Sequence, residues 1–365
     1  MYEFGNKPST CCIKYIQLNF LSEVGATDCL HFFTDRNFSC GRYPEFDSVR
    51  LYSLVGAELA EKGQIILIAA DIFSEYERIL FYSPFERQLP CGLYLPDFNT
   101  LIAAGCNVHI AERLSARYFD IGRALNGKSS PVEEIAGYTM NQSNAYMNRS
   151  LELMGAAELL LKEYMKNGRE LLKADKLRSF AARKTASMIS ERKKVGTELY
   201  RSVSAVTCSG YRFAEFPEDY RIICLEDCIG AASSAFVKSA SKAACKLGCN
   251  TIISRAVDSE SAPLHLIIPE LKTAFISDSE LLPAKMKFSE KISLNRFYSR
   301  VLLVSREHDT DFFRDYIRKM YSEAALYARI CMDIKNQGRK ILLPFINEKT
   351  ASEIASEIVH CILNR

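Results

Sequence analysis

Two stretches of the chain carry residues at the spacing of a phosphate-binding loop, whose full pattern is G-x-x-x-x-G-K-[ST]. In such a loop, backbone N–H groups surround phosphate oxygens, a lysine reaches the outer phosphates, and a hydroxyl at the start of a helix holds magnesium. The candidate nucleotide-binding residues of the two stretches are Gly56, Glu61, Lys62 and Gly63, and Asp227, Gly230, Ser233 and Ser234.

The first stretch keeps the lysine of this pattern but loses the hydroxyl. Lys62 stands at the lysine position, Gly63 at the hydroxyl position, and Glu61 adds a carboxylate where phosphates would bind. Lys62 next to Glu61 is also the ordinary sequence of a solvated ion pair at the end of a turn. This stretch is therefore a relic candidate for binding an anion.

The second stretch keeps the hydroxyl but loses both glycines and the lysine. Asp227 and Ala232 stand at the glycine positions, Ser233 at the lysine position and Ser234 at the magnesium position. Serines before an apolar helix ordinarily cap it, and we expect capping rather than phosphate binding here.

The carboxylates alone argue against tight nucleotide binding. Like charges about 4 Å apart cost roughly 1 kcal/mol in water and about 4 kcal/mol at an effective dielectric of 20. Each 1.4 kcal/mol is about a tenfold loss of affinity. We expect no cofactor, no catalytic residue and no metal ligand, and only weak binding of ATP and magnesium.

The elements around both stretches repeat at nearly constant spacing. The chain reads RLYSLVGAELAEKGQ from Arg50 and RIICLEDCIGAASSA from Arg221, an offset of 221 minus 50, or 171. GLYLPDFNTLIAAG around Pro96 matches LHLIIPELKTAFIS around Pro269, an offset of 173. Short apolar runs of this kind are typical of buried parallel strands. The spacing predicts two copies of one α/β unit, at residues 1–198 and 199–365.

The last third of each copy, residues 142–194 and 311–364, has apolar residues at helical spacing, which predicts a helical hairpin packed on its own α/β unit. One segment, QIILIAADIF after Gly63, is ambiguous. It is either a strand that follows a helix capped by Gly63, or the first helix of the unit. The equal spacing in the two copies favours the helix.

In order and spacing, including the terminal segment RKILLPFINEKTASEI, the chain resembles the tandem P-loop ATPases of bacteria. The resemblance implies two P-loop NTPase-like units with parallel sheets and crossover helices. That family carries an Asp-Gly-Thr-Ala-Pro-His run whose acid is expected to orient magnesium. The matching positions here are Ala104, Gly105, Cys106, Asn107, Val108 and His109 in the first copy, and Ser277, followed by Asp278, in the second.

Both copies therefore depart from the family at the phosphate loop and at the acid. The resemblance implies a degenerate pair of P-loop units, and we expect a non-catalytic scaffold or regulatory protein with a protein partner. The alternative is an ATP-binding protein or ATPase with an unorthodox site. Cys106 with His109 lacks the third group of a nucleophilic site, and Cys224, Cys228, Cys245 and Cys249 lack the spacing of a zinc site.

A second alternative is nucleic-acid binding by residues 162–194, where eleven Lys and Arg face four Asp and Glu. Only Tyr164 and Phe180 could stack on bases, and the net charge of the whole chain is +3, so we do not expect nucleic acid as the partner. The chain has thirteen cysteines, an odd number, and no export signal or membrane-length apolar run. We expect a cytoplasmic protein that does not enter the membrane.

Overall fold

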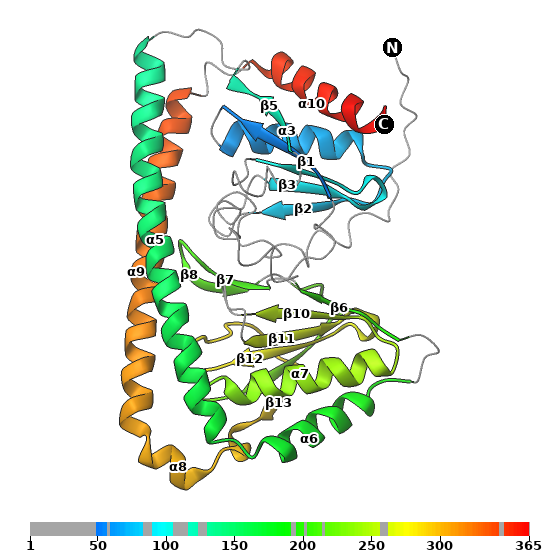
Figure 1. The fold of residues 1–365 in the computed structure, drawn as a ribbon, viewed down its shortest axis with the longest axis vertical. Coiled ribbons are helices and arrows are strands. Elements are labelled where there is room, and N and C mark those ends of the chain that lie inside the picture. The colour runs from blue at the N-terminus through cyan, green and yellow to red at the C-terminus, as the bar shows by residue number, and fades with distance from the viewer. Residues whose placement is uncertain are drawn as a thin grey trace.

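The structure is a computed structural model that describes residues 49–56, 59–82, 90–104, 116–122, 130–190, 195–200, 203–213, 216–255, 262–342 and 347–364. It is an α/β fold with two main sheets, as the sequence predicts. In Figure 1 the two sheets lie between two outer layers of helices, and two long helices run along one side of the molecule.

The first sheet has the strand order β2-β3-β4-β1-β5. Helix α3 (Leu59–Ile72) follows β1, the first strand of this sheet along the chain. The segment after Gly63 lies inside α3, so the helix interpretation of that segment is confirmed. The strands are β1 (Arg50–Val55), β2 (Ile79–Tyr82), β3 (Pro90–Leu95), β4 (Thr100–Ala103) and β5 (Arg117–Asp120).

The second sheet has the order β13-β9-β12-β11-β10-β6, in which the first five strands repeat the first sheet read from β5 to β2. Helix α7 (Ala231–Lys246) follows β9 as α3 follows β1. A separate hairpin is formed by β7 (Ser204–Thr207) and β8 (Gly210–Phe213). The strands of the second sheet are β6 (Glu198–Tyr200), β9 (Arg221–Glu226), β10 (Thr251–Arg255), β11 (Pro263–Ile268), β12 (Thr273–Asp278) and β13 (Glu290–Ser293).

The proline turns show how closely the two sheets correspond. Each is a three-residue 3-10 helix, Pro96–Phe98 or Pro269–Leu271, followed by a residue in the left-handed region. These residues are Asn99 at φ 45° and Lys272 at φ 47°. Arg50 then pairs with Thr100, as Arg221 pairs with Thr273. The repetition expected from the spacing is thus present in strand order, turn geometry and register.

The prediction of parallel sheets is confirmed only in part. β1 runs parallel to β4 and β5, but β3 is antiparallel to both β2 and β4, and β11 is antiparallel to both β10 and β12. The reason is the length of the connection. A turn of three residues can join antiparallel strands, whereas parallel neighbours need a crossover of a dozen residues or more.

The helical segments are much longer than a hairpin. α5 (Ser130–Glu170) has 41 residues and α9 (Glu307–Leu342) has 36, so they extend about 60 and 54 Å at 1.5 Å per residue. They pack side by side and antiparallel, with Ser150 Oγ donating to Ala324 O and Tyr321 donating to Glu158 Oε1. Helices of this length carry the chain from one sheet to the other (Figure 1).

The short helices that follow therefore pack on the opposite unit, and the predicted hairpin on its own unit is wrong. α6 (Ala174–Ala186) packs on α7, and α10 (Glu348–Leu363) packs on α3. The six buried residues of α10 belong to the apolar core of the first sheet. The division at residues 198 and 199 stays a prediction, and it assigns to each repeat a helix that covers the other repeat.

One apolar core surrounds the first sheet and a second lies between the second sheet and its helices. Alternate residues of the central strands of the second sheet contribute to each, with Ile267 and Ile276 in the first core and Leu266 and Phe275 in the second. A short helix, α8 (Arg300–Ser305), precedes α9. Within the ranges given above, no helix has both the length and the apolar character required to cross a bilayer.

Two glycines of α5 test how tightly this helix is held. A Cβ added to Gly168 would lie 2.5 Å from Ile229 Cγ2 and 3.0 Å from Ala231 Cβ, whereas a Cβ on Gly155 would meet nothing within 4 Å. Helix propensity favours alanine by about 1 kcal/mol at both positions. We expect Gly155→Ala to stabilise the protein by about 0.5–1 kcal/mol and Gly168→Ala to destabilise it by about 1–3 kcal/mol because of overpacking.

Urea unfolding of both variants checks this prediction, since the two substitutions are chemically identical and lie in the same helix. Equal stabilisation by both would show that α5 does not press on the segment around Ile229.

Candidate phosphate-loop site

In the second repeat a loop of four residues joins β9, which ends at Glu226, to α7, which begins at Ala231. Gly230 caps the helix at φ 94°, a left-handed conformation that glycine adopts at little cost. A strand, a tight loop and a helix thus follow one another where the sequence predicts a phosphate loop. The first turn of such a helix has backbone N–H groups without intrahelical partners, and these attract anions.

The anion at this helix terminus is the carboxylate of Asp227. Its side chain is buried, with 1% of its surface exposed. Oδ2 accepts the backbone N–H of Ser233 at 2.6 Å, and Oδ1 accepts that of Ile229 at 3.1 Å. The carboxylate therefore takes up the donors that a phosphate would need.

Tyr298 completes this arrangement from the far side. Its hydroxyl donates to Asp227 Oδ1 at 2.8 Å and accepts the backbone N–H of Ala232 at 3.0 Å. Burial, together with the adjacent carboxylate of Asp227, raises the pKa of Tyr298 well above its usual value, so the hydroxyl keeps its proton. The neighbouring Asn295 Oδ1 accepts the N–H of Cys228 at 2.9 Å. Residues 295–298 thus close the loop.

The prediction that Ser233 and Ser234 cap the helix is wrong. α7 begins at Ala231, so both serines lie inside its first turn, and the residue at the N-cap position is Gly230, which has no side chain. Ser233 Oγ is buried and has no hydrogen-bond partner in the described part of the chain. Asp227 acts instead, because its carboxylate lies before the helix and reaches the N–H of the third helical residue, the geometry that favours a capping acid.

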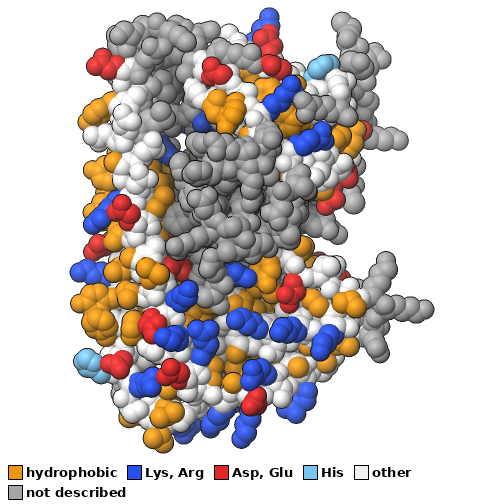
Figure 2. Space-filling model, in the orientation of Figure 1, with side chains coloured by type: hydrophobic (Ala, Val, Ile, Leu, Met, Phe, Trp, Pro, Cys, Tyr) orange, Lys and Arg blue, Asp and Glu red, His pale blue; other side chains and the backbone are white. Residues whose placement is uncertain are grey.

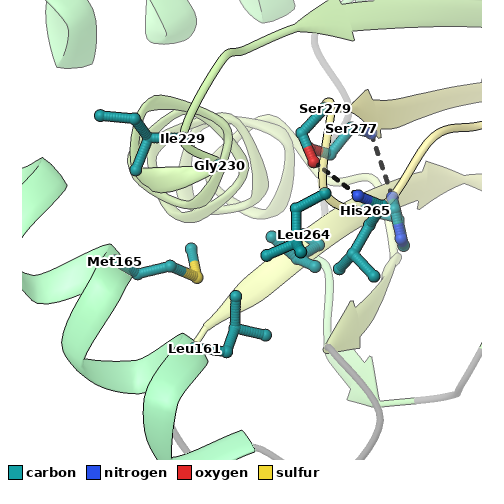
Figure 3. A pocket seen from close by; sticks show the side chains of 10 residues that line it. Leu161, Met165, Ile229, Gly230, Leu264, His265, Ser277 and Ser279 are labelled. Carbon is teal, nitrogen blue, oxygen red and sulfur yellow. Dashed lines mark hydrogen bonds between the residues drawn. The ribbon is translucent and has the colours of Figure 1, made fainter. Parts of the chain in front are cut away.

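Helix α5 covers the same loop. Leu161 and Met165 of α5 line a cavity with Ile229, Gly230 and residues of β11 and β12 (Figure 3). Its volume is about 10 Å³, which is close to the minimum of roughly 10–15 Å³ for one water molecule. A phosphate group does not fit there while α5 is in place.

In the first repeat, three of the four predicted residues lie inside a helix. Gly56 follows β1 at φ 86°, but α3 begins at Leu59, so Lys62 and Gly63 lie within the helix instead of at its start. Lys62 is half-buried and Gly63 is buried. Glu61 belongs to α3, but its side chain is not among those that the structure describes.

Asp120, which the sequence analysis missed, lies beside Gly56 at the end of β5. A Cβ on Gly56 would overlap Asp120 Oδ1, and the same oxygen accepts the N–H of Gly122 at 2.8 Å. The glycine is therefore required by its left-handed φ and by this close approach. The register of β1 and β5, which pairs Val55 with Asp120, carries no sequence signal by itself.

The residues at the positions of the metal-orienting acid make hydrogen bonds that hold the ends of the strands. Ala104 is buried and its N–H donates to Cys91 O at 2.9 Å. Ser277 N–H donates to His265, and Asp278 Oδ1 accepts the N–H of Ala284 at 2.9 Å, which holds the chain after β12. The remaining positions, Gly105, Cys106, Asn107, Val108 and His109, lie outside the described residues.

A buried pair of Ser204 and His265 was also missed. His265 Nε2 lies 3.2 Å from Ser204 Oγ, as in a nucleophilic pair, but Nδ1 accepts the N–H of Ser277 at 3.0 Å. The proton of the neutral ring must then be on Nε2, which cannot accept a proton from the serine. Burial lowers the pKa of His265 to about 3, so the ring is neutral near pH 7. We assign this pair to the core.

The four cysteines at 224, 228, 245 and 249 are free thiols. Burial and the neighbouring Asp278 carboxylate raise the pKa of Cys224 to about 12. In the parts of the chain described above, no three His, Cys, Asp or Glu side chains are grouped in a way that could hold a metal ion.

No protein-family model matches this chain, and comparisons with curated proteins and with solved structures give no match either.

Proposed function

We propose that this protein is a non-catalytic, tandem P-loop-like protein that acts as a scaffold or regulatory partner of another macromolecule. The observation that carries the proposal is the buried carboxylate of Asp227, which accepts the N–H groups of Ile229 and Ser233 at the terminus of α7. A nucleotide phosphate would have to displace a carboxylate that is already bonded to these donors. It would also be repelled by that charge at a short distance in a medium of low dielectric constant.

Helix α5 supports the same proposal. Gly168, Met165 and Leu161 place the long helix directly over the loop, and the residual cavity has about 10 Å³. In this proposal, the loop of the second repeat has become a packing contact between a strand, a helix and α5. Such a contact suits a rigid scaffold, since the loop that would otherwise move with nucleotide is held by buried side chains.

The second candidate is an ATP-binding protein that uses the first repeat. Gly56 and Asp120 are exposed at the carboxyl end of β1 and β5, the edge at which open α/β sheets bind ligands. Lys62, which stands at the lysine position of the expected loop, is half-buried in the helix that follows β1. These observations favour the first repeat over the second as the place where nucleotide would bind.

Thermal melts with and without millimolar MgATP test the proposal, because a ligand that binds only the folded state raises its stability. We expect no change in Tm for the wild type, and Lys62→Ala is expected to change stability by no more than about 0.5 kcal/mol. Binding with a Kd a hundredfold below the ATP concentration would add about 2.7 kcal/mol.

An increase of Tm with MgATP that is lost in Lys62→Ala would contradict the proposal in favour of the second candidate. Magnesium without nucleotide is the control for a general effect of the cation on stability.

A further inference from the structure

The outer helical layers of the two repeats carry opposite charge. α6 and α7, which cover the second sheet, together contain seven Lys and Arg and one Asp. α3 and α10, which occupy the equivalent layer on the first sheet, contain two Lys and five Asp and Glu. The modest net charge of +3 for the whole chain therefore conceals a local basic surface. We call α6 and α7 the basic layer.

The basic residues of α7 form one stripe. Lys238, Lys242 and Lys246 are four residues apart and all exposed, while Phe236, Val237 and Ala240 are buried against the sheet. Residues four apart lie on one face of a helix. On α6, which packs on α7, Lys176 and Arg183 are also exposed. Figure 2 shows Lys and Arg side chains gathered over this part of the molecule.

Neighbouring acids do not neutralise this stripe. Among the described residues, the three lysines of α7 form no ion pair, whereas the pairs on α6 use Arg178 and Lys184. Partial burial of its ammonium group and the nearby cations Arg169, Arg255 and Lys242 lower the pKa of Lys238. Like charges held together without acids raise the free energy of the folded protein, and a bound polyanion would relieve that repulsion.

The chemistry around the basic layer favours phosphate contacts over base stacking. A hollow of about 520 Å³ next to α6 is lined by Lys176, Arg183 and Arg296 and by the rings of Phe180 and Phe297. The Arg296 guanidinium covers both rings, at 4.7 and 5.0 Å from their centroids. Tyr164, the other aromatic of the basic segment, is 1% exposed. Neither Phe180, which is covered by Arg296, nor Tyr164, which is buried, is free to stack on a base.

The same layer lacks the features of a protein interface. In the described part of α6 and α7, no large hydrophobic side chain is exposed. Protein–protein interfaces bind mainly through a few apolar or aromatic anchors at their centre. Phosphate backbones are instead bound by Lys and Arg without such anchors. The charge and the missing anchors together favour a nucleic acid over an acidic protein.

We infer that the basic layer binds the phosphate backbone of duplex nucleic acid without reading its sequence. This inference names a partner for the scaffold proposed above and rests on that role. α7 is 16 residues long, so it extends about 24 Å, a length over which a duplex carries roughly 14 phosphate charges in total, at one per 1.7 Å. The stripe of three lysines, with Lys176 and Arg183, supplies the neutralising charge.

The test is fluorescence anisotropy of a labelled DNA duplex of about 20 base pairs, titrated at several salt concentrations without nucleotide. We compare wild type with Lys238→Gln/Lys242→Gln/Lys246→Gln. The matched control is Lys319→Gln/Lys340→Gln/Lys349→Gln, which removes three exposed lysines from α9 and α10. Circular dichroism melts establish that both variants fold.

We expect the wild-type affinity to fall linearly with salt on a log-log plot, and the α7 variant to lose about ten- to a hundredfold at low salt with a slope shallower by about 2–3. The control variant is expected to stay within about twofold of wild type.

Absence of salt-dependent binding, or equal losses in both variants, would overturn the inference. So would displacement of the duplex by poly-glutamate at equal charge concentration, which would indicate an acidic protein partner. Because ATP is absent throughout, these outcomes are independent of whether either repeat binds nucleotide.

Discussion

Replacement of Asp227 by alanine is expected to destabilise the protein by about 2–5 kcal/mol. The carboxylate accepts from Ile229 N–H, Ser233 N–H and the Tyr298 hydroxyl, all of which are buried. Its removal leaves three donors with neither water nor a protein acceptor. The loss of a capping side chain alone costs about 0.5–2 kcal/mol, and each buried donor left unsatisfied adds about 1–3 kcal/mol.

Asp175→Ala is the matched control, because Asp175 lies in the first turn of α6 and pairs with Arg178. Its side chain is 96% exposed, so water replaces every bond it makes. We expect a change within about 0.5 kcal/mol. Chemical denaturation of both variants measures the difference. A cost for Asp227→Ala as small as that of the control would mean that water or another anion replaces the carboxylate, and that the loop is open.

The same carboxylate shows where sequence reasoning about the site succeeded and where it failed. The offset of 171 residues placed Gly56 and Asp227 correctly at the ends of β1 and β9. The role of Asp227 was missed because Ser233 is also a capping residue and stands just before the apolar run. Which of the two caps depends on the residue at which the helix begins, and α7 begins at Ala231, before the serine.

The direction of β3 and β11 was a similar failure. Hydrophobic periodicity identifies a strand but carries no information about its direction. The proline turn did carry that information, since Pro96 and Pro269 each begin a connection too short for parallel neighbours. The repeated turn thus indicates both the duplication and, through its length, the antiparallel direction of β3 and β11.

α6 and α10 each pack on the opposite unit, which we call the exchange of these helices. The exchange follows from the length of the preceding helices, which the sequence pattern underestimated. The predicted helical region began at residue 142, whereas α5 begins at Ser130. Twelve further residues add about 18 Å, enough to carry the chain past its own sheet. Helix boundaries are the least certain feature of a sequence pattern, and here the boundary decides which unit receives the next helix.

A buried isoleucine of α10 provides the test of this exchange. Ile358 is 0% exposed and belongs to the core of the first sheet, with residues of β1 and α3. Ile358→Ala is expected to cost about 2–5 kcal/mol, because the loss of buried methyl groups leaves a cavity that the neighbours fill only in part. The control is Ile341→Ala in α9, where the same side chain is 43% exposed. We expect that change to stay within about 0.5 kcal/mol.

The segments that Ile358→Ala destabilises distinguish packing of α10 on the first unit from packing on its own, second unit. α10 is the last element of the second repeat. If it packed on its own unit, Ile358→Ala would lower hydrogen-exchange protection in α7 and β9. Exchange predicts that Ile358→Ala instead lowers hydrogen-exchange protection in α3 and β1, more than 280 positions earlier in the chain, and leaves α7 protected. Loss of protection centred on α7 would contradict the exchange. Two units of this kind need not unfold together. Hydrogen-exchange rates of individual segments are therefore more informative than a single melting temperature.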